Sequence, residues 1–427
     1  MRLPRLSTRA WMMVLALLCA LWIGAESSAI VQRQGVMLPN SILPVGRDFV
    51  VFYSAAKIIT AGDGAALYDV ARQQEEISRV VGYDSFHLPY AYPAFFALLY
   101  VPLSALPYLW AYGFALAGMV AALIGAALVL RTVSPTARRY PVFIILALLA
   151  YLPITWATFG GLNVGLTLLC LAGAYSSLIR QRQRTAGVLL GCLLFKPQIA
   201  LPMLGLMAWR RQWRVLMTAL AIGGALTFAA AALVAPTWPL DFARLVLSDS
   251  YHKNELECCG GFHVGLPSVA AYALPHAGML QAAIVGLGVG AAALTLRACR
   301  GSSQLDARFP LQFGLVLAVA ISWSPHALFY ETGLLTLPIL ALIDSRGAEK
   351  GFTDTGQRLS LRYQLLLAAL YAGGVSWPFD RSFGFQPMVV IPLLVAVLCW
   401  NWLRGLSEPA SSSALPARPV ALTSAAD

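Results

Sequence analysis

Four side chains in this apolar sequence have the chemistry of a catalytic site: Asp48, Lys196, His326 and Glu331. Asp48 follows the first hydrophobic run, where its carboxylate could accept a proton from a substrate hydroxyl. Lys196 interrupts the apolar stretch 185–209. A lysine in a hydrocarbon layer costs about 2.5 to 3.5 kcal/mol, so it is usually paired or functional, and its compact charge suits a phosphate. We therefore look for a site that combines a base with a bound phosphate.

Each of these residues also has a purely structural explanation. Asp48 would be a favoured N-cap for the helix predicted by the apolar spacing of Phe49–Thr60, and capping is compatible with a role as base. Lys196 could extend its ammonium group to a membrane interface. His326 follows Ser-Pro and could be a turn residue, and Glu331 could pair with an arginine of an outer loop.

Motifs for nucleotides and metals are absent from the sequence. There is no P-loop, no glycine fingerprint for dinucleotides and no pair of Cys or His at metal-binding spacing. A soluble nucleotide sugar or ATP is therefore not the expected substrate. The seven cysteines lie mostly in apolar segments, as small core residues do. Cys258 and Cys259 are adjacent in a polar loop, where a comfortable disulfide is rare, and they receive no role.

The composition is that of an integral membrane protein. Of 427 residues, 59% are hydrophobic and 11% are charged, and the mean hydropathy is +0.70. A water-soluble domain carries about a quarter charged residues, so this chain has too few for an aqueous surface. Apolar runs of about 17 to 25 residues recur along the chain, which predicts spanning helices rather than a barrel. The net charge of +11 comes from short arginine clusters between these runs, and these indicate membrane orientation rather than nucleic-acid binding.

Basic clusters mark the cytoplasmic side of a membrane. The amino terminus, with Arg2, Arg5 and Arg9, is therefore predicted to be inside. The apolar run 11–24 is either the first membrane helix or part of a signal peptide. Residues 26–107 then form a large outer loop, whose closely spaced prolines predict short interfacial helices.

Beyond this loop, apolar runs and basic clusters continue to alternate. They predict a second outer loop at 235–275, a cytoplasmic carboxyl terminus and a disordered cytoplasmic tail at 407–427. With the first helix we predict about ten full crossings. The others fall at 108–130, 141–158, 164–179, 215–234, 277–296, 311–323, 328–342, 363–375 and 389–403.

The segment 185–209 conflicts with simple alternation because basic clusters lie on both of its sides. Two cytoplasmic clusters require an even number of crossings, yet the segment is too short for two full helical spans. A hairpin of two half-length helices fits, with its tip at Phe195–Gln198, where Pro197 interrupts the helix. Such backbone is tolerated at membrane depth only inside protein or beside a wet cavity. The alternative is a single span, which would invert everything downstream.

We therefore predict an all-α, polytopic membrane protein with about ten transmembrane helices and one re-entrant hairpin, about twelve helices in all. Residues 1–406 would form one membrane-embedded domain in an inner (plasma) membrane. In this topology Asp48, Lys196, His326 and Glu331 all lie near the outer ends of helices. A lipid-linked substrate would meet that face.

Four stretches of the chain, in this order, resemble landmarks of glycosyltransferase family 87, the polyprenol-phosphate-mannose-dependent α-mannosyltransferases. They are GRDFVVFYSAAKII…LYD (46–69), YAYPAFFALLYVPLSALP (90–107), FKPQ (195–198) and SPHALFYE (324–331). The similarity extends over roughly Gly46 to Ile343. It implies the fold of type C membrane glycosyltransferases.

The resemblance also implies an activity. A hexose, with mannose expected, would pass from a polyprenyl-phosphate donor to a lipid or glycan acceptor on the extracytoplasmic face, with inversion of the anomeric centre. An acid of the first outer loop, here Asp48, would be the base, and Lys196 and His326 would lie near the donor phosphate. No cofactor, metal or nucleic acid is implied. Candidate substrate contacts are Arg47, Tyr92, Asn163, Gln198, Tyr330 and Glu331.

Three short stretches depart from the family pattern. Tyr92-Pro93-Ala94 stands where relatives often have a double proline, and Gly160–Asn163 lacks a glutamine beside glycine. Tyr330-Glu331 replaces a common Tyr-Asp pair. These differences leave the identity of the sugar and the acceptor open.

Two other classes of protein compete with this interpretation. A multi-pass transporter or lipid flippase would use Lys196 as an ion-coupling or substrate site, but the sequence shows no inverted repeat and has two large outer loops. A structural or assembly subunit would have no need for Asp48, Lys196 and His326 on one face.

Overall fold

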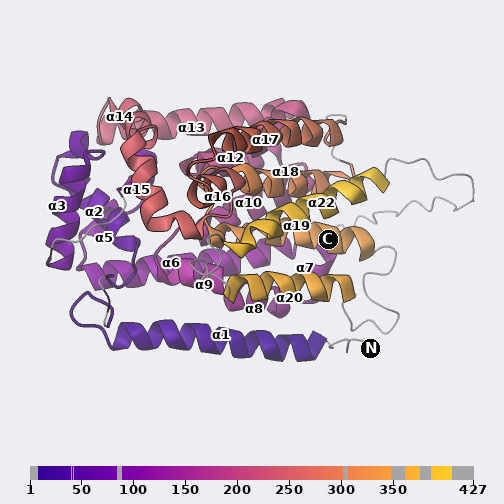
Figure 1. Ribbon diagram of the computed structural model, residues 1–427, viewed down its shortest axis with the longest axis horizontal. Coiled ribbons are helices and arrows are strands. Elements are labelled where there is room, and N and C mark those ends of the chain that lie inside the picture. Colours follow the sequence, from indigo (N-terminus) through magenta and orange to yellow (C-terminus); the bar gives the residue numbers. More distant parts are fainter. Residues whose placement is uncertain are drawn as a thin grey trace, which may run out of the picture.

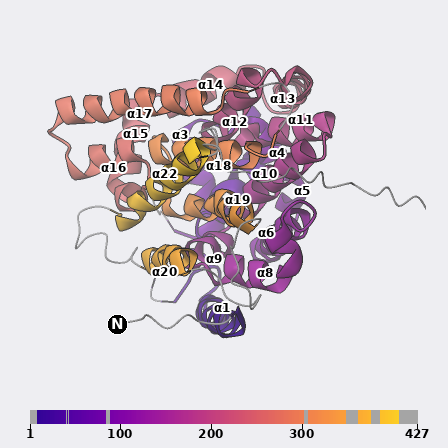
Figure 2. The same cartoon turned by 90° about the vertical axis from the view of Figure 1, so that its right-hand side faces the viewer.

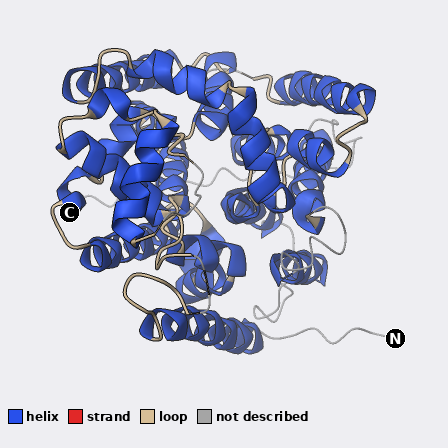
Figure 3. Ribbon diagram, turned by 60° about the vertical axis from the view of Figure 1, so that its left-hand side comes forward, coloured by secondary structure: helices blue, strands red, loops and turns tan. Residues whose placement is uncertain are grey.

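The computed structural model describes residues 8–39, 41, 43–83, 89–301, 306–347, 361–375 and 386–405. These residues form helices joined by turns, and the only extended pairing among them is in isolated bridges (Figures 1 and 3). The predicted all-α class is confirmed for this part of the chain. The tail predicted at 407–427 lies outside the described residues.

Five helices of the described chain are long and apolar enough to cross a membrane. Two of them, α1 and α17, lie at the edge of the bundle (Figure 2). The five are α1 (Thr8–Val31), α6 (Tyr108–Leu130), α13 (Trp213–Leu233), α17 (Gly278–Ala298) and η6 with α22 (Pro387–Val389 and Val390–Gly405).

A sixth span is broken. Helices α8 (Pro141–Ala150) and α9 (Leu152–Phe159) meet at an angle of 68°. Pro153 lies in the first turn of α9, where its ring and missing N–H interrupt the helical ladder behind it. The bend brings the end of α9 towards the middle of the bundle.

The predicted number of crossings is not confirmed by these criteria. Several predicted crossings correspond to helices shorter than a full span, so five or six helices satisfy the length test among the described residues. The shorter helices are α10 (Val164–Ile179), α11 (Gln183–Cys192), α12 (Pro197–Trp209), α18 (Phe309–Trp323), α19 (Thr336–Gly347) and α20 (Leu361–Val375). Of these, α10, α18 and α19 are largely buried, whereas α11, α12 and α20 each keep an exposed face.

The hairpin predicted at 185–209 is present. Helices α11 and α12 are joined by η2 (Leu193–Phe195) and Lys196, and the chain reverses there. The two open ends lie together, because Gln183 Nε2 donates a hydrogen bond of 3.1 Å to Gln212 Oε1. A single span would place these two residues on opposite sides of the bundle.

Helix α13 runs alongside the first arm of the hairpin in the same direction. Gly187 faces Val215 and Gly191 faces Ala219, with room for no more than hydrogen at either glycine. Small residues let two helices approach closely, which is a common way of packing in membrane proteins. The arrangement carries Lys196 away from the arginine clusters to about the middle of α13, where Leu194 packs on Gly223.

The arginine-rich turns collect at one end of the bundle. Arg180 Nη2 donates to the Thr132 carbonyl at 3.1 Å, and Arg210 Nη1 donates to Gln312 Oε1 at 2.7 Å. Each bond joins turns that are far apart in the sequence. This clustering is what the alternation of apolar runs and basic groups predicts.

Short helices from the two predicted outer loops cover the opposite end, on the left in Figure 1. The loops touch each other through Tyr68 and Phe242, whose ring centroids are 5.8 Å apart. The first loop contributes α2 (Phe49–Thr60), η1 (Gly64–Ala66), α3 (Val70–Val81), α4 (Ala94–Leu98) and α5 (Val101–Ser104). The second contributes α14 (Trp238–Val246), α15 (Asp249–Cys259), η3 (Gly260–Phe262) and α16 (Leu266–Ala273).

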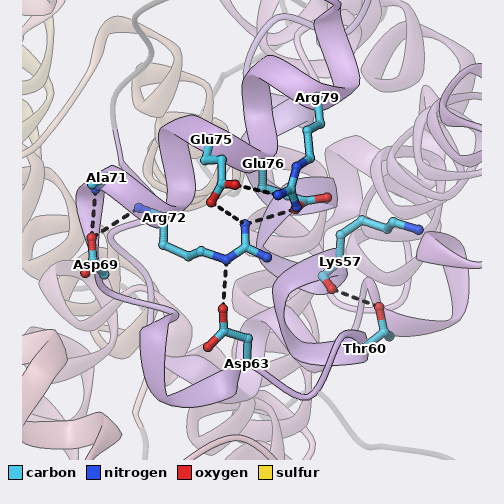
Figure 4. Close-up of polar contacts among 9 residues, drawn as sticks. All are labelled: Lys57, Thr60, Asp63, Asp69, Ala71, Arg72, Glu75, Glu76 and Arg79. Atoms are coloured by element: carbon cyan, nitrogen blue, oxygen red, sulfur yellow. Dashed lines mark hydrogen bonds and ion pairs between the residues drawn. The ribbon is translucent and has the colours of Figure 1, made fainter.

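Polar contacts fix α3 against α2 in this cover (Figure 4). The Asp69 carboxylate caps α3 by accepting from the Ala71 N–H at 2.8 Å. The Arg72 guanidinium forms two ion pairs, one with the Asp63 carboxylate at 2.7 Å and one with the Glu76 carboxylate at 3.0 Å. The network ties the end of α2 to the next helix, which helps to hold the start of α2 in place.

The turn between α9 and α10 supports the start of α2. Gly161 has φ +79°, and a Cβ there would lie 2.4 Å from the Phe49 Cβ. The Phe49 N–H also donates to the Gly160 carbonyl at 3.1 Å. Only glycine fits a left-handed position that lies so close to another segment of the chain.

Gly161→Ala is therefore expected to destabilise the protein by about 1 to 3 kcal/mol, from left-handed strain and overpacking. Thermal unfolding of purified protein in detergent would measure it. Gly118→Ala on α6 is the matched control, because open space surrounds Gly118. Equal midpoints for the two variants would contradict this account of the turn.

Candidate functional site

Asp48 occupies the N-cap position of α2, but its side chain makes no capping hydrogen bond. The expected position is therefore correct and the expected contact is wrong. Gly46 (φ +77°) and Arg47 (φ +35°) form a left-handed turn just before it, and Asp48 itself is helical rather than extended. A capping side chain needs the extended conformation, so the carboxylate is left available for another partner.

Arg47 holds this turn in place. Its guanidinium binds the Glu26 carboxylate at 2.8 Å and lies 4.9 Å from the centre of the Trp156 ring. Both partners of the ion pair are mostly buried, with side-chain exposures of 14% and 15%. Arg47 was a candidate substrate contact, and here its charge is used by Glu26.

The Asp48 carboxylate is partly accessible but has protein around it on most sides. Its Oδ2 atom lies close to the Gly160 backbone. Burial raises the pKa of Asp48 to about 6, although the charge of Arg47 acts in the opposite direction. A carboxylate with a pKa near the working pH is suited to accept a proton.

Lys196, at the hairpin tip, is fully enclosed and paired. Its Nζ lies 2.8 Å from Glu331 Oε1, with side-chain exposures of 2% and 1%. It also donates to Asn163 Oδ1 at 3.2 Å and lies 5.3 Å from the centre of the Tyr330 ring. Glu331 and Tyr330 belong to η4 (Phe329–Leu335), so this cluster joins the hairpin, the start of α10 and the segment after α18.

A second polar cluster surrounds His326. Its Nδ1 is hydrogen-bonded to Glu255 Oε1, and His263 Nε2 lies 3.4 Å from the same oxygen. Glu255 is 4% exposed and comes from α15, in the second large loop. Glu255 and His263 were not predicted from the sequence. The loop contains several acidic residues, and no motif distinguishes Glu255 from the others.

The charges of these histidines and Glu255 depend on one another. Burial alone would raise the pKa of Glu255, but its hydrogen bond to His326 and the histidine charges lower it. Burial lowers the pKa of His263 to about 4, so this ring is neutral. Burial would also lower the pKa of His326, yet the bond to Glu255 and its charge raise it.

Tyr92 lies where the two clusters and Asp48 meet. Burial raises the pKa of its phenol, a hydrogen bond with Asn163 lowers it, and the charges of Glu331, Asp48 and Glu255 raise it further. These three acids come from separate segments of the chain. All three therefore lie within electrostatic reach of the Tyr92 hydroxyl.

Most of the predicted site residues therefore converge. Asp48 acts on Tyr92 and Tyr330, and so do Glu331, the partner of Lys196, and Glu255, the partner of His326. Gln198 stands apart: it is half-buried in the first turn of α12, and in the described chain no hydrogen bond or ion pair joins it to the others. The described residues contain no group of three side chains arranged to hold a metal.

Cys258 and Cys259 do not follow the expectation. They are joined by a disulfide at the end of α15, three and four residues after Glu255. Cys259 has left the helical conformation there (φ −127°), which lets the two sulfur atoms meet.

Comparison with known proteins supports this arrangement at the family level. The model of glycosyltransferase family 87 matches residues 90–325, more than half of the chain. The chain belongs to glycosyltransferase family 87. No curated protein and no solved structure gave a match.

The family match covers Tyr92, Asn163, Lys196, Glu255 and His263 and ends just before His326. Asp48 lies before its start. Membership of family 87 makes the chain a membrane glycosyltransferase, which acts on a sugar donor and an acceptor. It sets aside the transporter and assembly-subunit alternatives.

The Lys196–Glu331 pair yields a prediction for stability. Glu331→Gln leaves a buried, uncompensated ammonium, so it should cost about 3 to 5 kcal/mol. Replacing both residues, with Lys196→Met and Glu331→Gln together, should cost less because no net charge then stays buried. Apparent melting temperatures in detergent would rank the variants.

Glu257→Gln is the control for this comparison. Glu257 is 66% exposed and pairs only loosely with Lys253, at 3.8 Å. Its removal should leave the melting temperature unchanged, since exposed pairs contribute little. A double variant less stable than Glu331→Gln would contradict the role given to the pair.

Proposed function

We propose that this family 87 protein transfers a hexose, with mannose expected, from a polyprenyl-phosphate donor to a lipid or glycan acceptor. The observation that carries the proposal is that one partly accessible carboxylate, Asp48, lies within electrostatic reach of the same tyrosines as Glu331 and Glu255, the partners of Lys196 and His326. A glycosyl transfer from a phosphate needs a base for the attacking hydroxyl and positive charge for the departing phosphate.

The reaction requires only these groups of the chain. The acceptor oxygen forms a bond to the anomeric carbon while its proton passes to the Asp48 carboxylate. The bond between the anomeric carbon and the phosphate oxygen breaks on the opposite face, so the anomeric centre is inverted. The electron pair leaves with the polyprenyl phosphate. His326 and Lys196 stabilise the charge that develops on that phosphate.

Lys196 would play its part through a shared charge. Glu331 neutralises its ammonium in the substrate-free protein, at 2.8 Å. A phosphate nearby would compete with Glu331, whereas His326 keeps an accessible ring and can contact it directly. The partly exposed ring of Tyr92 suits the apolar face of a hexose, and Asn163 can offer hydrogen bonds beside it.

The distribution of charge supports an orientation in the membrane. Arginine-rich turns gather at one end of the bundle and the site lies at the other, so the basic end would face the cytoplasm and the site the extracytoplasmic side. Both termini would be cytoplasmic, in an inner (plasma) membrane. A polyprenyl-phosphate sugar in the outer leaflet would then reach Asp48.

Cysteine labelling would test this orientation. In a variant without native cysteines, Arg244→Cys on exposed α14 should react in intact cells with a membrane-impermeant maleimide. Arg214→Cys, exposed at the basic end, should react only after the cells are opened. The reverse pattern would overturn the proposed orientation.

Asp48→Asn should reduce transfer by about 10² to 10⁴-fold, the usual contribution of a general base. The assay is transfer of labelled mannose from polyprenyl-phosphate-mannose in membranes that contain equal amounts of each variant. Asp241→Asn on α14 is the control, because Asp241 pairs at 3.3 Å only with an exposed arginine. Normal turnover by Asp48→Asn would refute the assignment of the base.

The wild-type activity should also depend on pH. The base must be deprotonated, so transfer should fall as the pH drops through about 6, the pKa of Asp48. This acid limb would be measured with the same transfer assay between about pH 5 and 8. An activity that is flat through pH 6 would contradict Asp48 as the titrating group.

A further inference from the structure

His326 is held at its backbone independently of its ring. The Val264 N–H donates to the Ala327 carbonyl at 2.8 Å, and the His326 N–H donates to the Ser324 hydroxyl at 3.1 Å. The Ser268 hydroxyl also donates to the Pro325 carbonyl. The position of the turn therefore does not depend on what the imidazole binds.

The orientation of the ring is set by one side chain from a different loop. Glu255 holds Nδ1 of His326, while the ring keeps a side-chain exposure of 34%. Because Nδ1 is occupied, Nε2 is the nitrogen left for a substrate. A histidine ring takes its tautomer and its direction from the partner of the other nitrogen.

We propose that Glu255 is a positioning residue for His326, which it holds by Nδ1 so that Nε2–H is directed at the donor phosphate. This inference rests on the proposed function and assigns a role to the second outer loop, which closes over the donor. Glu255 ionised beside it favours the positively charged form of the imidazole. Without Glu255 the ring would be a neutral and freely rotating group.

The charged and titratable neighbours of the ring come from α15, η4 and the hairpin tip, and Glu255 has the largest favourable effect on the charged form of the ring. On α15, Glu255 favours the charged ring, and His263 behind it is neutral and does not oppose it. From η4, Glu331 also favours the charged form, and from the hairpin tip Lys196 disfavours it. The last two are paired with each other at 2.8 Å, so Glu255 has the largest favourable effect.

In Glu255→Gln, the transfer activity should be lost at a lower pH than in the wild type as the pH rises. The imidazolium is lost as the pH rises through its pKa, and removal of Glu255 lowers that pKa. A drop of one unit would reduce the charged fraction about tenfold at alkaline pH. We expect the ratio of transfer at pH 8 to that at pH 6.5 to fall several-fold, by about fourfold for a pKa drop of one unit. Glu255→Asp should restore much of the ratio, and Glu257→Gln, on the same helix, should not change it.

A second measurement does not need activity. Diethyl pyrocarbonate modifies neutral imidazole, and peptide mass spectrometry follows its reaction with His326 separately from the other histidines. In Glu255→Gln at pH 7 this reaction should be several-fold faster than in the wild type, while Glu257→Gln should match the wild type.

The outcomes separate the two claims. An unchanged modification rate, or a transfer loss in Glu255→Gln that is equal at all pH values, would overturn the positioning role. If the wild type transfers no polyprenyl-phosphate sugar, the proposed function fails, and the modification rate still decides whether Glu255 controls His326.

Discussion

The buried ion pair between Lys196 and Glu331 determines how the hairpin meets the rest of the bundle. Two charges with almost no exposure are stable only when they face each other, so the tip of α11 and α12 must lie against η4. Asn163 completes the contact from the start of α10. Three segments that are far apart in the sequence are thereby held at one point.

The other site residues are arranged around this point. The turn that precedes α10 packs against Phe49 and so places Asp48, and the segment that leads into η4 carries His326. Asp48 and the backbone of His326 are positioned by backbone contacts rather than by their functional groups. This leaves the carboxylate of Asp48 and one nitrogen of His326 available, although both lie deep among protein atoms.

Much of this architecture follows from the sequence by simple physics. The even number of crossings required by two basic clusters predicts the hairpin, and the cost of a lysine in an apolar segment predicts that Lys196 has a partner. The order of four short motifs predicts the family. The number of membrane-spanning helices was harder to predict, because α10 and α18 are shorter than a membrane-spanning helix and are enclosed by other helices.

The parts that sequence could not predict depend on contacts between distant loops. Nothing in the residues around Glu255 distinguishes it from the neighbouring Glu257, and only the packing of α15 on the turn at His326 gives it two histidine partners. The capping role of Asp48 failed for a local reason, since the left-handed turn at Gly46 and Arg47 gives Asp48 a helical backbone.

The hairpin tip meets a partner that is made much later in synthesis. Lys196 is inserted well before Glu331 has left the ribosome, so during that interval the half-length helices have an unneutralised ammonium between them. The Lys196 ammonium must be kept out of the hydrocarbon layer until the segment with Glu331 has been synthesised, and the site is incomplete before then. A membrane glycosyltransferase of this kind therefore has an incomplete site as a fragment.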